Sequence, residues 1–190
     1  SPVEALNAVK ENDLKVVAYP KSGGNDSLRE GLVGYYKGIG IDLEPADINI
    51  TNGGSEALQI ALSVTCNPDD EVIVFEPFYT NYNSFALQND VKLKPITTKI
   101  EDGFALPPMS EVEKNITPKT KGIIICNPGN PTGCLYSKES LLQLGEIAKK
   151  ASEMPGADFV SLSLEGADPN GADKPVEECV AIAKEVAEAI

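Results

Sequence analysis

Short apolar runs alternate along the first 150 residues with segments in which apolar positions recur at helical spacing. The short runs predict four buried strands, at residues 48–51, 71–75, 91–96 and 122–126. The periodic segments predict helices at residues 2–12, 26–37, 56–65, 109–115 and 137–150, and a turn followed by a helix at residues 77–88. Asp26 or Ser27 is expected to cap the second helix. Strands that alternate with helices are typical of an α/β fold. We therefore expect a three-layer sandwich with a mostly parallel sheet.

The final segment, residues 151–190, repeats this pattern once. Residues 159–164 alternate like a strand, a loop rich in Gly, Asp, Asn and Pro follows, and residues 176–190 carry an apolar stripe at helical spacing. The charge also changes, because residues 1–150 hold 20 acidic and 14 basic side chains whereas residues 151–190 hold 9 and 2. We expect two segments, 1–150 and 151–190, that pack into the same single domain.

The composition argues against several classes of partner. A net charge of -13 disfavours binding to nucleic acid or to an anionic membrane. We expect neither a transmembrane segment nor a signal peptide, because no apolar run is long enough for the first and the opening residues lack the pattern of the second. Four cysteines without metal-ligand spacing, and without any histidine, favour reduced thiols in a cytoplasmic protein over a metal site.

Residues 51–58, Thr-Asn-Gly-Gly-Ser-Glu-Ala-Leu, join a predicted strand to a predicted helix. Gly53, Gly54 and Ser55 would leave free backbone N–H groups and a hydroxyl at the positive end of that helix. This arrangement suits the phosphate of a small molecule. The alternative is a glycine turn that only connects two elements.

Residues 76–82, Glu-Pro-Phe-Tyr-Thr-Asn-Tyr, follow the predicted strand 71–75. Proline and clustered aromatic residues at a strand end put a flat ring at the carboxyl edge of the sheet, where open α/β sheets bind ligands. Tyr79 is the candidate ring. Ordinary core packing is the alternative interpretation.

Residues 126–133, Cys-Asn-Pro-Gly-Asn-Pro-Thr-Gly, follow an apolar strand and precede a helix. A turn stiffened by proline, with asparagine favouring the bend, would explain part of the pattern. In this setting the eight residues resemble the Asn-Pro-x-Asn-Pro-Thr-Gly turn of the class I/II aminotransferases, the pyridoxal-phosphate enzymes of the aspartate aminotransferase fold. The resemblance spans roughly residues 1–150, and the other motifs follow in the family's order and spacing.

The resemblance implies a set of contacts to pyridoxal phosphate. Gly54 and Ser55 would hold the phosphate, and Glu56 would contribute its backbone. Tyr79 would stack on the pyridine ring, and Asn130 would hydrogen-bond the ring hydroxyl. On this basis the fold would be a truncated aminotransferase large domain, completed by the C-terminal strand and helix.

Two further matches lie nearer the N-terminus. Tyr19 resembles the tyrosine that reaches across a dimer interface to the neighbouring cofactor phosphate, which implies a homodimer. Residues 27–30, Ser-Leu-Arg-Glu, resemble the family's Leu-Arg-Glu helix, in which the arginine is more often structural than catalytic. Arg29 is the only arginine of the chain, so the sequence lacks the residue that usually binds a substrate carboxylate bidentately.

The sequence also departs from the family. Neither the lysine that forms the Schiff base nor the aspartate that keeps the pyridine nitrogen protonated is recognisable. None of the 15 lysines follows a strand in the family's serine-rich context, and imine formation is the step that activates the amino acid. We therefore expect no catalytic residue and no transaminase activity from these 190 residues.

The tail carries a resemblance of its own. Residues 148–150, 156–162 and 165–169 resemble one β–α unit of the TIM barrel in the small subunit of the corrinoid iron–sulfur protein. One such unit cannot enclose a corrinoid, so no corrinoid site is implied. The leading hypothesis is an engineered or recombined chimera that serves as a scaffold without transaminase activity. A residual module that binds pyridoxal phosphate or another phosphate is the alternative, and an active aminotransferase is the least favoured.

Overall fold

The computed structural model describes residues 2–152, which form parts of two compact units. The N-terminal unit comprises residues up to 37 together with 42–50, and the second unit comprises 38–41 and the chain from Thr51 onward. The predicted strand 159–164 and the predicted final helix lie outside the described residues, as does the proposed join of segments 1–150 and 151–190 into one domain.

The N-terminal unit contains the helices α1 (Val3–Lys10) and α2 (Asp26–Gly38) and the short 3-10 helix η1 (Pro45–Asp47). The prediction that Asp26 or Ser27 caps α2 was wrong. The helix begins at Asp26, and the side-chain oxygen of Asn25 accepts hydrogen bonds from the Leu28 N–H at 3.2 Å and the Ser27 hydroxyl at 2.6 Å. Asn25 is the better placed cap because its carbonyl reaches the third amide of the first turn.

Arg29 connects α2 to η1 within this unit. One of its terminal guanidinium nitrogens donates to the carbonyl of Pro45, and the other lies 3.7 Å from the carboxylate of Asp26. Its side chain is only 16% exposed. The lone arginine therefore has a structural role in this unit.

The predicted strand at 48–51 does not form. A strand requires a neighbour that continues its hydrogen-bond ladder. Here the Ile50 N–H instead donates to the carbonyl of Gly23 at 3.1 Å, so this segment is held by a loop rather than by a strand. The contact is close, because Gly24 has a φ of +95° and a Cβ at that position would overlap the Ile50 side chain.

Within residues 2–152, the sheet of the second unit has three parallel strands in the order β2-β1-β3: β1 (Glu71–Glu76), β2 (Lys92–Thr97) and β3 (Thr120–Ile124). In the central strand, Val74 pairs with Pro95 on one side and Ile124 on the other. Pro95 lacks an N–H, which is tolerated because β2 forms one edge of the described sheet. The mostly parallel α/β fold expected from the sequence is confirmed.

β3 begins two residues before its predicted start. Glu71 pairs with Thr120 but Val72 pairs with Gly122, so Lys121 is an extra residue in the ladder. Thr120 is itself buried, and its hydroxyl accepts a hydrogen bond from the Thr117 N–H at 2.9 Å. This polar start of the strand has no apolar signal in the sequence, which is why the prediction missed it.

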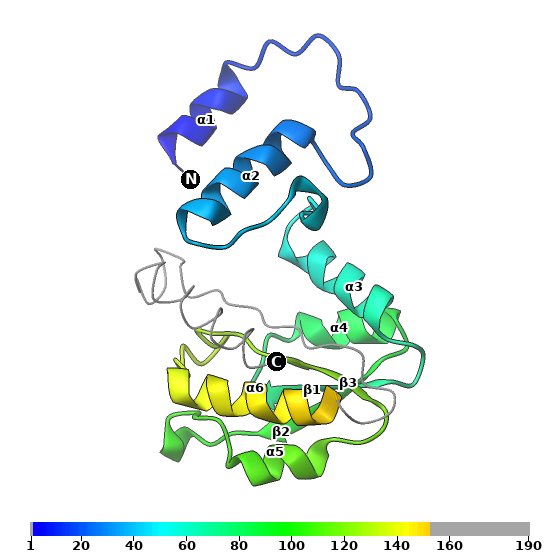
Figure 1. The fold of residues 1–190 in the computed structure, drawn as a ribbon, viewed down its shortest axis with the longest axis vertical. Coiled ribbons are helices and arrows are strands. Elements are labelled where there is room, and N and C mark those ends of the chain that lie inside the picture. The colour runs from blue at the N-terminus through cyan, green and yellow to red at the C-terminus, as the bar shows by residue number, and fades with distance from the viewer. Residues whose placement is uncertain (1, 153–190) are drawn as a thin grey trace. The chain divides into compact units, whose positions relative to one another are not determined.

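The described part of the second unit also contains four α-helices and the short 3-10 helix η2 (Ile100–Asp102): α3 (Gly54–Thr65), α4 (Asn81–Gln88), α5 (Met109–Asn115) and α6 (Lys138–Ser152). Successive residues of β1 face opposite sides of the sheet. Val72 and Val74 pack with residues of α3 and α4, whereas Ile73 and Phe75 pack with residues of α5 and α6. Figure 1 shows the helices α3 and α4 on one side of the sheet and α6 on the other. The second unit therefore has three layers, helix, sheet and helix.

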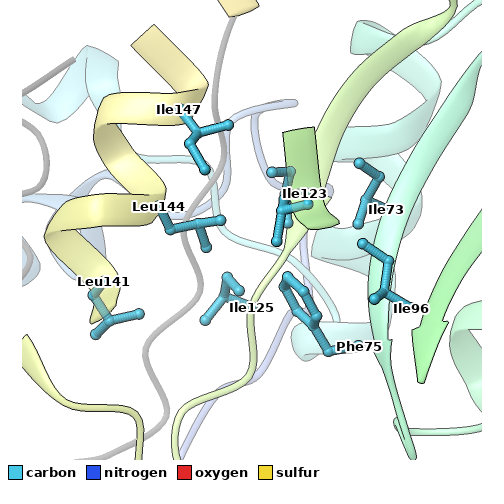
Figure 2. Packing of buried hydrophobic residues seen from close by; sticks show 9 residues of the cluster. Ile73, Phe75, Ile96, Ile123, Ile125, Leu141, Leu144 and Ile147 are labelled. Atoms are coloured by element: carbon cyan, nitrogen blue, oxygen red, sulfur yellow. The ribbon is translucent and has the colours of Figure 1, made fainter. Parts of the chain in front are cut away.

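The layer beneath α6 forms the larger apolar cluster. Figure 2 shows the strand residues Ile73, Phe75 and Ile123 directed toward one face of α6. That face presents Leu141, Leu144 and Ile147, all at most 5% exposed. Their spacing is that of one helical stripe.

No helix among residues 2–152 is long and apolar enough to cross a membrane.

Candidate cofactor-binding edge

The turn before α3 has an open backbone. Gly53 has φ 92° and ψ 169°, a conformation that is essentially restricted to glycine. A Cβ built on Gly53 or Gly54 would meet no atom within 4 Å. The first helical hydrogen bond runs from the Ala57 N–H to the Gly53 carbonyl at 3.3 Å. The amide groups of Gly54, Ser55 and Glu56 precede it at the positive end of the helix.

The side chain of Glu56 folds back over this turn. Its carboxylate accepts a hydrogen bond from the Asn52 N–H, and the Thr51 hydroxyl donates to the Gly53 carbonyl at 3.0 Å. Both contacts stabilise the turn. Gly54, Ser55 and Glu56 are all exposed residues.

Tyr79 lies four residues beyond Phe75 of β1 and is half-buried. Its hydroxyl accepts a hydrogen bond from the Asn81 side-chain amide at 2.6 Å, and its ring meets Tyr82 edge to face with the centroids 5.6 Å apart. Tyr82 in turn stacks on Phe78 at 6.0 Å. Tyr79 packs against the same apolar cluster as Leu58 of α3. Tyr79 therefore lies on the same side of the sheet as α3, the helix that follows the glycine turn.

The turn after β3 is fixed by its own backbone and by a buried asparagine. The side-chain oxygen of Asn127, 7% exposed, accepts a hydrogen bond from the Tyr136 N–H at 2.8 Å. The Gly129 N–H donates to the Cys134 carbonyl at 2.8 Å. A Cβ on Gly129 would lie 2.6 Å from the Thr132 hydroxyl, so a larger residue there would displace the Thr132 side chain. This turn presents Asn130 with an exposed side chain.

A small cavity lies where the β1 and β3 turns meet. Its lining includes Asn130, Phe78, Tyr82, Cys126 and Tyr136, and its volume is about 20 Å³. A volume of this size holds about one water molecule. This cavity is therefore too small to hold a pyridine ring.

The six predicted site residues are distributed unevenly. Asn130 lines the small cavity together with the neighbours of Tyr79, whereas Tyr79 and Ser55 lie outside its lining in the described part of the chain. Gly54, Ser55 and Glu56 form the turn at the start of α3. Tyr19 is fully exposed and belongs to the N-terminal unit, so its part in a cofactor site stays a prediction.

Burial sets the ionisation of the tyrosine that follows the β3 turn. Burial raises the pKa of Tyr136 to about 12, and the neighbouring Cys134 and Cys126 thiols act in the same direction. Burial also raises the pKa of the Cys134 thiol above its ordinary value. The edge of this cavity is therefore uncharged at neutral pH.

A second cavity, of about 530 Å³, lies at the end of β2 beside η2, α5 and α6. Its lining includes Lys99, Asp102, Leu106, Ser140 and Gln143. Its size would admit a small molecule. None of the six predicted site residues lines this larger cavity. It is therefore not the site that the sequence motifs predict.

Comparison with known proteins decides the family. The sequence profile of the family described as Aminotransferase class I and II matches residues 3–160. The chain belongs to the class I and II aminotransferase family. The match runs past Lys150, and the division of the chain at that residue stays a prediction. Enzymes of this family use pyridoxal phosphate, which agrees with the cofactor that the motifs indicate.

Individual aminotransferases support the assignment. The glutamate-pyruvate aminotransferase AlaA of Escherichia coli K12 is 34% identical over 162 residues, which are 84% of this chain and 40% of AlaA. The putative aminotransferase YugH of Bacillus subtilis is 36% identical over 151 residues, 77% of this chain and 38% of YugH. The chain thus spans about 40% of the length of AlaA.

Solved structures agree on the fold. An aspartate aminotransferase mutant from Thermus thermophilus superposes with a TM-score of 0.71 at 28% identity, covering 84% of this chain and 40% of the other. An Escherichia coli aminotransferase superposes with a TM-score of 0.73 at 33% identity, covering 80% and 37%. The part of this chain that superposes on these structures therefore has the aminotransferase fold.

Sequence reasoning missed two residues that shape this edge. Asn127 is buried and fixes the turn through Tyr136, yet an Asn-Pro pair indicates only a turn and says nothing of its burial. Phe104 lines the small cavity from the loop after η2 and has a φ of 60°. A positive φ at an aromatic residue has no signal in the sequence apart from the preceding glycine, Gly103.

Proposed function

We propose that this chain is a scaffold derived from a pyridoxal-phosphate aminotransferase, whose residues 51–136 form a cofactor-binding edge. The observation that carries the proposal is the open turn before α3, where Gly53 and Gly54 leave free space beside uncapped helical amides. The same type of helix N-terminus binds phosphate groups in many proteins. The exposed amides and the Ser55 hydroxyl fit the cofactor phosphate.

The remaining contacts follow the family pattern residue by residue. Gly54 and Ser55 would hold the phosphate, and the Glu56 amide would face it while its carboxylate stays bonded to Asn52. Tyr79 would stack on the pyridine ring. Asn130, exposed at the turn after β3, would donate to the ring hydroxyl. When bound, the cofactor supplies an electron-withdrawing ring to a linked amino acid.

We further propose that these 190 residues do not transaminate by themselves. No lysine lies in the family's serine-rich context, and the sequence shows no aspartate for the pyridine nitrogen. The lone Arg29, already bonded to Pro45, is committed to the N-terminal unit. Amino-group transfer from an amino acid to a 2-oxo acid should therefore be equally slow with and without the protein, and a clear acceleration would contradict this part of the proposal.

The chimeric origin is also a proposal. It is supported by the resemblance of residues 156–169 to a barrel β–α unit and by the shift in charge after Lys150. A full-length sequence of the source gene would test it. An open reading frame that continues as an aminotransferase after residue 150 would contradict it.

We propose a cytoplasmic homodimer, in which Tyr19 reaches the phosphate site of a second copy. The support is the resemblance at Tyr19 and the full exposure of its side chain. Light scattering during size-exclusion chromatography would test the dimer, and a monomer at high concentration would contradict it.

A thermal melt with and without pyridoxal phosphate tests the binding proposal. A ligand that binds only the native state raises the transition temperature. We expect a cooperative transition that rises with the cofactor, and a smaller rise for Ser55→Ala. The matched control Ser63→Ala changes an exposed serine of the same helix and should behave like the wild type. A transition that ignores the cofactor would overturn the proposal.

A further inference from the structure

The turn before α3 contains a reactive pair of residues, of which the asparagine has no part in the proposed cofactor contacts. Asn52 precedes Gly53, and both residues are exposed. In an asparagine–glycine pair the glycine nitrogen can attack the side-chain amide of the asparagine, because glycine has no Cβ to hinder the approach. The two reacting groups belong to adjacent residues, so the covalent chain itself keeps them close. Asn52 is therefore a candidate site of deamidation.

The structure leaves both reacting groups without competing contacts. Among residues 2–152, neither the backbone N–H of Gly53 nor the side-chain amide of Asn52 has a hydrogen-bond partner. A Cβ built on Gly53 would meet no atom within 4 Å, so no neighbouring group packs against that side of the glycine. Rotation of the Asn52 side chain toward the glycine nitrogen therefore breaks no hydrogen bond of the described chain.

The contacts that hold the turn use other atoms of the same residues. The backbone N–H of Asn52 donates to the carboxylate of Glu56, and the Thr51 hydroxyl donates to the Gly53 carbonyl at 3.0 Å. The first contact places a carboxylate beside residue 52. A new carboxylate on residue 52 would be repelled by Glu56 and would add negative charge at the positive end of α3. Conversion of this amide to an acid therefore opposes the binding of an anion at the turn.

We propose that Asn52 deamidates spontaneously through Gly53, and that the product weakens phosphate binding at the turn before α3. The Gly53 nitrogen bonds to the side-chain carbonyl carbon of Asn52, the C–N bond of the side-chain amide breaks, and ammonia leaves with the proton of the glycine nitrogen. Water then opens the resulting succinimide at either carbonyl and gives aspartate or isoaspartate. The net reaction is the hydrolysis of one amide to a carboxylate and ammonium. The effect on binding rests on the proposed function, whereas the deamidation does not.

Peptide mapping tests the modification. The 190-residue protein is incubated in mildly alkaline buffer under native conditions and digested with trypsin and a protease that cleaves after glutamate. Peptide 38–56 then contains Asn52 together with the exposed Asn49, a matched control that is followed by Ile50 instead of glycine. We expect fragment masses to show conversion of the amide to an acid at residue 52, while Asn49 stays intact.

A sample of the same protein in denaturant gives the reference rate. An intact Asn52 in the native protein, at a time when the denatured sample has converted, would overturn the proposal, and so would equal conversion of Asn49 and Asn52. The variant Asn52→Gln should lose the mass change at residue 52, because glutamine would have to close a larger and slower ring. The other asparagine–glycine pair, Asn170 and Gly171, falls in a different peptide and does not interfere.

Ligand binding gives the second readout. The probe is pyridoxamine 5′-phosphate, which has the ring and phosphate but cannot condense with lysine. Asn52→Asp, which reproduces the charge of the product, should weaken its binding about tenfold while circular dichroism shows the fold intact. Incubation should weaken binding by the wild type but not by Asn52→Gln.

Unchanged affinity of both Asn52→Asp and the deamidated wild type would overturn the effect on binding. Absence of binding by the fresh wild type would refute the proposed function and this effect together. The peptide masses would still decide whether Asn52 deamidates, so the failure of one proposal is distinguishable from the failure of the other.

Discussion

Replacement of Gly53 by alanine tests the geometry of the turn before α3. Its φ of 92° and ψ of 169° lie in a region that side chains with a Cβ avoid, at a cost of about 1–3 kcal/mol. The new methyl group would meet no atom within 4 Å, so steric overlap adds nothing to this cost. We therefore expect Gly53→Ala to lower the free energy of unfolding by about 2 kcal/mol.

Gly54→Ala is the matched control. Gly54 is the first residue of α3, has no positive φ, and would also place its Cβ in open space. Because alanine favours helix over glycine by up to about 1 kcal/mol, this variant should be neutral or slightly stabilised. The two substitutions add the same methyl group to adjacent residues, so a difference between them isolates the backbone conformation.

Urea unfolding followed by far-UV circular dichroism would measure both variants. For a chain of this size, a loss of about 2 kcal/mol corresponds to a fall of about 4–8 °C in the melting temperature. Equal stability of Gly53→Ala and the wild type would refute the strained turn. Equal losses in both variants would do so as well, because they would show that the effect comes from the added methyl rather than from φ.

Three further predictions concern the core, the cavity and the N-terminal helix. Leu141→Ala should lower the free energy of unfolding by about 2–5 kcal/mol, because Leu141 is 1% exposed, whereas Leu135→Ala, at 40% exposure, should have a much smaller effect in the same urea titration. The pKa of Tyr136 is raised to about 12, so its contribution to stability is complete below pH 10 and is lost as the pH rises through 12. Tyr136→Phe should flatten that alkaline decline in melts across this range, and an unchanged slope would refute the assignment. Asn25→Ala should destabilise α2 by about 1 kcal/mol, while the same loss from Asp26→Ala would contradict the cap described here.

The fold was largely predictable where burial alone decides structure. In β1, successive residues such as Val74 and Phe75 pack into opposite layers, so both faces are apolar. The result is a continuous apolar run in the sequence, which is typical of a central parallel strand. The stripe of α6 at Leu141 and Leu144 was equally clear. Predictions failed where the structure of a segment depends on its hydrogen-bond partner. The amide of Ile50, for example, donates to a loop carbonyl instead of to a neighbouring strand.

The candidate site was predictable to a different extent. The motifs identify Ser55, Tyr79 and Asn130 because residue types at fixed spacing carry the family pattern. Their surroundings depend on contacts between distant segments, which no local pattern records. The approach of Thr132 to Gly129 and the small volume beside Asn130 are of this kind.

The central claim is that the edge formed by residues 51–136 still recognises the phosphorylated cofactor. Isothermal titration calorimetry with pyridoxamine 5′-phosphate tests it most directly, with pyridoxamine as the control ligand that lacks the phosphate. We predict saturable binding of the phosphorylated ligand to the 190-residue chain, at least about tenfold weaker binding by Ser55→Ala, and much weaker binding of pyridoxamine. Equal affinities for the two ligands, or no saturable binding of either, would contradict the claim.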